Sequence, residues 1–153
     1  MNKEQFKEEL KKLNITLTKN QENQLEEYYN LLIEENKKIN LTTITKKEDV
    51  YLKHFYDSLT IIKVIDLTKK ETLIDIGTGA GFPGLVLKIV FPNLKVTLLD
   101  SLNKRINFLN KVIEKLNLTN IKTVNSRIET YQQETFDIVT SRAVSKINIL
   151  LRL

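Results

Sequence analysis

The stretch from Leu73 to Gly84 reads LIDIGTGAGFPG and holds all four glycines of the chain. An apolar run typical of a buried strand, Leu73 to Ile76, precedes the glycines, and an apolar helical pattern follows them. Glycine loses more conformational freedom on folding than any other residue, so four at one turn predict positive backbone angles or close approach to a ligand. The stretch therefore predicts a ligand-binding loop between the first strand and first helix of an α/β domain.

The glycine spacing is compatible with two classes of nucleotide cofactor. Gly79, Gly81 and Gly84 have the G-x-G-x-x-G spacing of dinucleotide-binding Rossmann domains. Asp75, however, stands in the strand just before the loop, where a carboxylate would repel a pyrophosphate and attract the cationic groups of S-adenosylmethionine. We therefore expect S-adenosylmethionine, with a nicotinamide dinucleotide as the alternative. A buried, hydrogen-bonded structural role for Asp75 also stays open.

Two further segments end predicted strands and offer polar groups to the same ligand. Asp100 follows the second strand, where an acid about 20 residues beyond the glycines accepts hydrogen bonds from a ribose diol. A role for Asp100 as a helix N-cap or a loop acid remains open. After the third strand, Ile128 and Glu129 offer a backbone group and a carboxylate to an adenine edge. The expected cofactor contacts from this reading are Asp75, Gly77, Gly79, Gly81, Asp100, Ile128 and Glu129.

The first part of the chain has a helical pattern. Up to Thr68 it contains neither glycine nor proline, and apolar residues recur at helical spacing. Thr18 and Gln21 fit a capping box that begins a long helix, and another helix is expected at Val50–Val64. Residues 1–68 are therefore predicted to form a helical cap.

Beyond residue 69, short apolar strands alternate with helices. The expected strands are Leu73–Ile76, Val96–Leu99, Ile121–Val124 and Phe136–Val139, and the expected helices are Gly84–Val90 and Lys104–Leu116. Such alternation predicts a parallel sheet with right-handed crossovers and helices on its faces. Residues 69–153 are therefore predicted to form an α/β Rossmann-like core.

Composition limits the classes of protein that remain. A chain of 153 residues that is 41% hydrophobic can bury one sizeable core. The chain has no cysteine, which excludes disulfides and thiolate metal sites, and we expect no metal. No run approaches the roughly 20 apolar residues of a membrane span, so we expect a soluble cytoplasmic protein. The net charge of +5 favours a polyanionic partner, although evenly spread lysines are also typical of a solvated surface.

The chain resembles the bacterial ribosomal RNA small-subunit methyltransferase G family, also called glucose-inhibited division protein B. Six pieces carry the resemblance, in the order and spacing of the family. They are LTTI at 41–44, KHFYDSL at 53–59, DIGTGAGFPG at 75–84, LLDSLNKRINFL at 98–109, SRIE at 126–129 and SRAV at 141–144. The joint match covers nearly the whole chain and is more specific than the glycine loop alone.

The resemblance implies a class I S-adenosylmethionine-dependent methyltransferase with an N-terminal helical cap. Its substrate would be N7 of a guanine in 16S ribosomal RNA, and its partner the free RNA or the 30S particle. By position, the family's cofactor contacts fall on Gly77, Phe82, Ile128, Glu129 and Arg142. Asp100 is similar to the ribose-binding acid of the wider fold.

Methyl transfer to guanine N7 needs few chemical groups. N7 has a free lone pair and no proton to remove, so orientation supplies the rate and no catalytic acid or base is expected. The family's H-x-x-D-S element matches His54, Asp57 and Ser58, which helical spacing places on one face. These three residues and Arg142 are the candidates for positioning the substrate. Alternatively, His54 could be hydrogen-bonded between cap and core, and Arg142 could form a structural salt bridge.

Seven cations near loops and helix ends are expected to form a basic face for RNA. They are Lys46, Lys47, Lys53, Lys104, Arg105, Arg142 and Lys146.

Family members continue through further strands beyond the fourth, whereas this sequence stops at Leu153. We therefore expect an incomplete sheet with later strands missing, which would leave an open edge. Three explanations are open: a trimmed chain, a truncated gene product, or a sheet completed by dimerisation. The oligomeric state is left open. The alternative to an enzyme is a cofactor-binding or RNA-binding remnant that has lost turnover.

Overall fold

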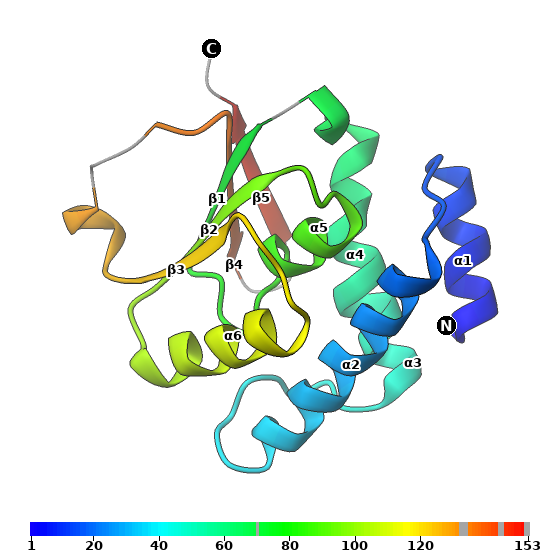
Figure 1. Cartoon of the computed structure of the whole chain (residues 1–153), viewed down its shortest axis with the longest axis horizontal. Helices are drawn as coiled ribbons and strands as arrows, with labels where there is room; N and C mark the ends of the chain where they lie inside the picture. The colour runs from blue at the N-terminus through cyan, green and yellow to red at the C-terminus, as the bar shows by residue number, and fades with distance from the viewer. Residues whose placement is uncertain (70, 132–134, 144–145, 152–153) are drawn as a thin grey trace.

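The structure is a computed structural model, in which residues 1–69, 71–131, 135–143 and 146–151 are described. Helices make up its N-terminal part, and a five-stranded sheet with further helices follows (Figure 1). The helical segments are α1 (Lys3–Lys12), α2 (Lys19–Asn36), α3 (Lys47–Val50), η1 (Tyr51–Tyr56), α4 (Asp57–Leu59), η2 (Thr60–Lys63), η3 (Leu67–Lys69), α5 (Gly84–Val90), α6 (Asn103–Lys115) and η4 (Ile128–Thr130). The strands are β1 (Thr72–Ile76), β2 (Lys95–Asp100), β3 (Ile121–Asn125), β4 (Ile138–Ala143) and β5 (Lys146–Leu151). Within the described ranges, no helix is long and apolar enough to cross a membrane.

The predicted capping box at the start of α2 is confirmed. The Gln21 backbone N–H donates to Thr18 Oγ1 at 3.1 Å, and the Thr18 N–H donates to Gln21 Oε1 at 2.8 Å. Two donors that the first helical turn would leave unpaired are thereby satisfied. Gln21 Nε2 also donates to the Ile89 carbonyl at 3.1 Å, so the same side chain ties the start of α2 to the end of α5.

The predicted helix Val50–Val64 is longer and less regular than expected. The helical run begins at Lys47 in α3, widens to π-helical turns in η1, continues as α4 and ends as a 3-10 turn, η2, at Lys63. Such π-helical turns occur often at functional sites, and here they contain His54. Periodicity located the helix, but it could not show the change in winding.

The strands form one sheet in the order β3-β2-β1-β4-β5. The predicted parallel pairing is present: β1 pairs in parallel with β2 and β4, and β2 pairs in parallel with β3. The end of β1, Ile76, therefore lies between Leu99 of β2 and Ser141 of β4. Because the carboxyl ends of parallel strands meet at one edge, the glycine loop, Asp100 and the loop after β3 come together there.

Two expectations for the end of the sheet are wrong. The fourth strand is not Phe136–Val139 but Ile138–Ala143, and Phe136 packs instead against buried apolar side chains on one face of the sheet. The sheet also continues, because β5 pairs antiparallel with β4, with Thr140 opposite Ile149. An antiparallel neighbour needs only a short turn, whereas our prediction considered parallel crossovers alone. The open edge expected at the fourth strand is therefore occupied by β5.

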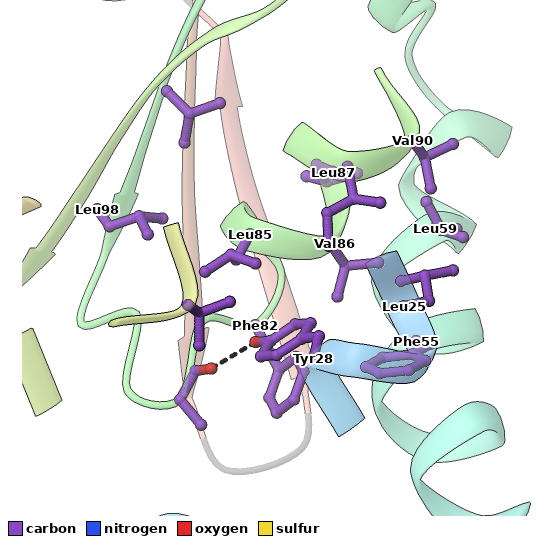
Figure 2. Close-up of a cluster of buried hydrophobic side chains, with 14 of the residues drawn as sticks. Leu25, Tyr28, Phe55, Leu59, Phe82, Leu85, Val86, Leu87, Val90 and Leu98 are labelled. Atoms are coloured by element: carbon purple, nitrogen blue, oxygen red, sulfur yellow. Dashed lines mark hydrogen bonds between the residues drawn. The ribbon is translucent and has the colours of Figure 1, made fainter. Parts of the chain in front are cut away.

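One hydrophobic cluster joins the N-terminal helices to the sheet. In Figure 1, α2 and α4 lie on the same side of the sheet as α5, against which both pack, and α2 also packs against α6. The central side chains of this cluster are drawn in Figure 2: Leu25, Tyr28, Phe55, Leu59, Phe82, Leu85, Val86, Leu87, Val90 and Leu98. The cluster crosses the predicted boundary near residue 68, so removing the helices would expose the apolar face of α5.

Replacing Gly84 by alanine is expected to destabilise the protein. A Cβ at this position would lie 2.6 Å from Leu98 Cδ2 and 2.8 Å from Asp75 Cβ, in a part of the core where neither atom can move freely. Overpacking of this kind costs roughly 1–3 kcal/mol, although alanine is the better helix former. Urea denaturation of Gly84→Ala should show the loss in the free energy of unfolding.

Asn107→Ala, an exposed position within α6, is the matched control, because there the extra helix propensity meets no clash. The control should be as stable as the parent or slightly more stable. A Gly84→Ala variant that matches the parent would contradict the close packing of α5 on β1 and β2.

Candidate functional site

The glycine loop turns sharply between β1 and α5. Gly77, Gly79 and Gly81 have φ angles of 66°, 60° and 103°, which side chains with a Cβ rarely adopt. Gly81 also has no room for a side chain, since a Cβ would clash with the Tyr28 hydroxyl. The Thr78 N–H donates to the Leu99 carbonyl at 3.0 Å, which fastens the loop to the end of β2. Conformation and packing together explain the glycine cluster.

Asp75 lies beneath this loop and is completely buried. Its Oδ2 accepts hydrogen bonds from Thr78 Oγ1 at 2.7 Å and the Gly84 N–H at 2.9 Å, and its Oδ1 accepts from Thr140 Oγ1 at 3.0 Å. Burial raises the pKa of this carboxyl from 3.8 to about 6, and the three donors oppose that rise.

The sequence argument that Asp75 faces a bound ligand and repels a pyrophosphate is therefore wrong. Its carboxylate points into the protein, because Thr78, Gly84 and Thr140 surround it. Asp75 instead has the alternative role given in the sequence analysis, that of a buried, hydrogen-bonded structural acid.

A pocket of about 370 Å³ lies at the carboxyl edge of the sheet. Its walls come from the end of β1, the end of β2 and the loop after β3, and they contain four of the predicted cofactor residues. Its lining residues are Ile76, Gly77, Leu99, Asp100, Ser101, Ser126, Arg127, Ile128 and Glu129. The glycine loop contributes Gly77 to this lining, whereas Gly79, Gly81 and Phe82 lie outside it.

Asp100 is the buried acid of the pocket, with 3% of its surface exposed. Its Oδ2 accepts a hydrogen bond from the Gly79 N–H at 2.9 Å, and its Oδ1 accepts one from the Leu102 N–H at 2.9 Å. Arg105 lies 3.6 Å from the same Oδ2. Each carboxylate oxygen can accept more than one hydrogen bond, so Asp100 keeps acceptor capacity toward the pocket.

Phe82 belongs to the seam between the glycine loop and the N-terminal helices. Its ring stacks on the His54 imidazole, with ring centres 4.2 Å apart and planes 7° apart. Next to it, the Tyr28 hydroxyl donates a hydrogen bond to the Ala80 carbonyl, shown dashed in Figure 2. Two aromatic contacts therefore hold the helices against the loop.

Arg142, at the end of β4, reaches across to the helical run. Its guanidinium lies 3.2 Å from Asp57 Oδ2, donates to the Lys53 carbonyl at 3.0 Å and contacts His54 Nδ1 at 3.3 Å. Its Nε is buried and has no hydrogen-bond partner among the described residues. The salt bridge that the sequence left open for Arg142 is thus present.

The contacts of His54 fix its tautomer. Arg142 can only donate, so His54 Nδ1 must accept, and the proton of a neutral ring is on Nε2. Nε2 then donates to Thr42 Oγ1 at 2.9 Å, and this hydroxyl also accepts the Ile44 N–H at 3.0 Å. Burial and the nearby Arg142 charge lower the pKa of His54 from 6.5 to about 4, so the ring is neutral at pH 7.

Apart from Gly79 and Gly81 of the glycine loop, the predicted site residues therefore fall into two groups, with two further residues buried separately. Gly77, Asp100, Ile128 and Glu129 share the pocket, whereas Phe82, His54, Asp57 and Arg142 meet at the seam. Asp75 and Ser58 are buried and hydrogen-bonded within the protein, Ser58 to the His54 carbonyl.

Sequence reasoning missed the parts played by Tyr28, Thr42 and Ser126. Tyr28 lies in the long helix predicted to begin at Thr18, and the hydroxyl of a tyrosine on the apolar face of a helix needs a polar partner, which is a signal that sequence alone offers. Thr42 and Ser126 lie within the LTTI and SRIE pieces that carried the family resemblance.

The seam predicts a pH-dependent stability that runs through His54. Between pH 6.5 and about 4, His54 is protonated in the unfolded chain but neutral in the folded protein. The free energy of unfolding therefore falls as pH falls through this range. The full difference between these two pKa values corresponds to a loss on the order of 3 kcal/mol. Glutamine does not titrate, so in His54→Gln the free energy of unfolding should fall less between pH 7.5 and a pH near 4 than in the parent. Urea denaturation at the two pH values measures this difference.

Asp75 acts in the opposite direction over an overlapping pH range, because its folded pKa is raised to about 6 and protonation favours the native state. It is present in both proteins, so the difference between parent and His54→Gln isolates the histidine. Parallel pH profiles for the two proteins would show that His54 is not held neutral by the seam.

Among solved structures, the chain is similar in fold to S-adenosylmethionine-dependent methyltransferases. One from Aquifex aeolicus is 24% identical, with a TM-score of 0.50 over 71% of this chain and 55% of that chain. A Plasmodium falciparum structure, described as a protein-L-isoaspartate O-methyltransferase in complex with S-adenosyl-L-homocysteine, is 20% identical, with a TM-score of 0.54 over 92% of this chain and 73% of that chain. The fold is thus that of class I methyltransferases.

Curated relatives are much closer in sequence, and each is named ribosomal RNA small subunit methyltransferase G. The relative from Bacillus subtilis is 49% identical over 100% of this chain and 66% of its own length. That from Macrococcus caseolyticus is 48% identical over 100% of this chain and 66% of its length, and that from Staphylococcus saprophyticus is 52% identical over 91% and 60%.

The chain thus spans 60 to 66% of the length of these relatives. The family model described as rRNA small subunit methyltransferase G (GidB) matches residues 21–153. All six sequence pieces that carry the resemblance lie inside this match. The chain therefore belongs to the rRNA small subunit methyltransferase G family.

Proposed function

We propose that the chain binds S-adenosylmethionine in the pocket at the carboxyl edge of the sheet and methylates N7 of a guanine in 16S ribosomal RNA. The observation that carries this proposal is a buried carboxylate, Asp100, in the wall of a pocket that Gly77 and Glu129 also line. The family of the chain supports the reaction class. Free small-subunit RNA or the 30S particle is the proposed partner, and the cytoplasm the proposed location.

The pocket residues fit the cofactor by their chemistry. Asp100 offers acceptor atoms for the two hydroxyls of a ribose, and its hydrogen bond from the Gly79 N–H fixes the orientation of the carboxylate. Gly77 lets the backbone approach the ligand because it has no side chain. Ile128, 41% exposed, offers an apolar surface to a base, and Glu129 offers a carboxylate beside it.

The proposed mechanism depends on positioning. The bound cofactor would supply an electrophilic methyl group. Guanine N7 has no proton to lose, so the protein needs no base, which agrees with a His54 that is neutral and occupied at both ring nitrogens. Holding the acceptor in line with the methyl group and excluding water can contribute roughly 7 to 11 kcal/mol. The chain's own residues would therefore act by orientation.

We propose that the helical cap of residues 1–68 closes one side of this site and that residues 69–153 form the core. The cap contacts the glycine loop through Tyr28 and His54, and it contacts β4 through the Arg142 guanidinium. The Nε of Arg142, which is buried and has no hydrogen-bond partner within the described ranges, leaves one donor for the cofactor or the RNA. In this role Asp57 and His54 hold Arg142 in place, and Ser58 and Asp75 support the elements that carry them.

Methyl transfer from labelled S-adenosylmethionine to 30S particles and to free 16S RNA tests the function. The proposal expects incorporation into RNA, mapped to one guanine by chemical cleavage at N7-methylguanine. Cofactor binding in calorimetry without transfer to either substrate would identify a remnant that has lost turnover. Binding of a nicotinamide dinucleotide in place of S-adenosylmethionine would overturn the proposal.

Removing the Asp100 charge should weaken the cofactor complex. Asp100→Asn loses a charged acceptor for the ribose, and such hydrogen bonds contribute about 1.5 to 3 kcal/mol, or roughly tenfold to more than hundredfold in Kd. Calorimetric titration with S-adenosylmethionine measures the change. Glu48→Gln, an exposed acid on α3 outside the pocket lining, is the charge-matched control and should bind like the parent. Equal affinity of Asp100→Asn and the parent would remove Asp100 from the cofactor site.

A further inference from the structure

A second pocket, of about 330 Å³, lies between the C-terminal end of α2 and the first turn of α6. Four cations line it: Lys37 and Lys38 directly after the end of α2, and Lys104 and Arg105 from the start of α6. Among the residues that the structure describes, no acid belongs to its lining. Two segments that are far apart in the sequence thus bring their positive charges to one hollow.

The stability of the fold does not account for these charges. Lys37, Lys38 and Lys104 are exposed and form no ion pair within the described part of the chain. Lys104 and Arg105 also stand in the first turn of a helix, where the positive end of the helix dipole disfavours cations. Such an arrangement is unfavourable for the isolated protein and favourable for one that receives an anion.

The cationic pocket is linked directly to the cofactor pocket. Arg105 lies 3.6 Å from Asp100 Oδ2, and the N–H of Leu102 donates to Asp100 Oδ1 at 2.9 Å. The segment from Asp100 to Arg105 therefore contributes to both hollows. A polyanion held in the cationic pocket would lie beside the proposed cofactor pocket.

We propose that the cationic pocket formed by Lys37, Lys38, Lys104 and Arg105 binds phosphate groups of single-stranded RNA next to the methylated nucleotide. The four cations of the pocket fit phosphate groups. The choice of RNA as the molecule that carries them rests on the proposed function, methylation of 16S ribosomal RNA. Lys37 and Lys38 were not part of the basic face expected from the sequence. Of that face, Lys47 pairs with Glu26, Arg142 with Asp57 and Arg105 with Asp100, so the unpaired charges of the pocket are Lys37, Lys38 and Lys104 within the described part of the chain.

The test is the salt dependence of RNA binding. A fluorescein-labelled poly(U) oligonucleotide is titrated with the parent and with a Lys37→Ala/Lys38→Ala double variant across a series of salt concentrations. The slope of log K against log salt is negative, and each lost phosphate contact reduces its magnitude by about 0.7 for single strands. The double variant should therefore lose about 1.4 from the slope, and Lys104→Ala about 0.7.

Lys11→Ala/Lys12→Ala is the matched control, because it removes two adjacent exposed lysines from the end of another helix. The control should keep the parent slope. An equal loss of slope in both double variants, an unchanged slope in Lys37→Ala/Lys38→Ala, or a parent that does not bind the RNA would each overturn the inference.

Two further arms separate the possible sources of failure. Calorimetry with inorganic phosphate should show no saturable binding at concentrations where RNA binds. The contrary result is saturable phosphate binding that the Lys37→Ala/Lys38→Ala change abolishes while RNA binding is unaffected. That result would identify a site for free phosphate and overturn the inference. Calorimetry with S-adenosylmethionine on the same variants should match the parent. A parent that ignores the cofactor overturns the proposed function, while the RNA slopes still decide the pocket.

Discussion

A buried carboxylate holds the strand, loop and helix of this site together. Asp75 in β1 accepts hydrogen bonds from Thr78 in the loop, from the Gly84 N–H at the start of α5, and from Thr140 in β4. Three elements are thus tied to one side chain, and burial is unfavourable enough to raise its pKa to about 6. Gly84 has no Cβ, so the helix can begin directly against the carboxylate. The shape of the loop above follows from this arrangement.

The N-terminal helices are joined to that unit by polar and aromatic contacts as well as by apolar burial. The His54 ring stacks on Phe82 of the loop, and its two nitrogens contact Arg142 from β4 and Thr42 from the segment after α2. A neutral histidine thus connects three segments that are distant in sequence. Hydrogen bonds fix orientation in a way that apolar contacts alone do not, so this seam sets how the helices sit against the site.

Much of the fold could be predicted because its signals are local. The capping box of Thr18 and Gln21, the alternation of strands and helices, and the glycine cluster each depend on neighbouring residues, and all three were confirmed. The bounds of β4 and the existence of β5 were not predicted. Both depend on pairing with a partner strand, which no short stretch of sequence specifies.

By itself, the sequence determined the glycine loop, the alternation of strands and helices along the chain, and the family. These features follow from residue types at short spacing. Only the tertiary structure decided which side chains line the pocket and which are buried within the protein. It turned Asp75 into the protein, placed Asp100 in the pocket, and separated Phe82 and Arg142 from that pocket at the seam. The physical reason is that a carboxylate or an aromatic ring has the same sequence signature whether its partner is a ligand or another part of the chain, and packing alone selects between them.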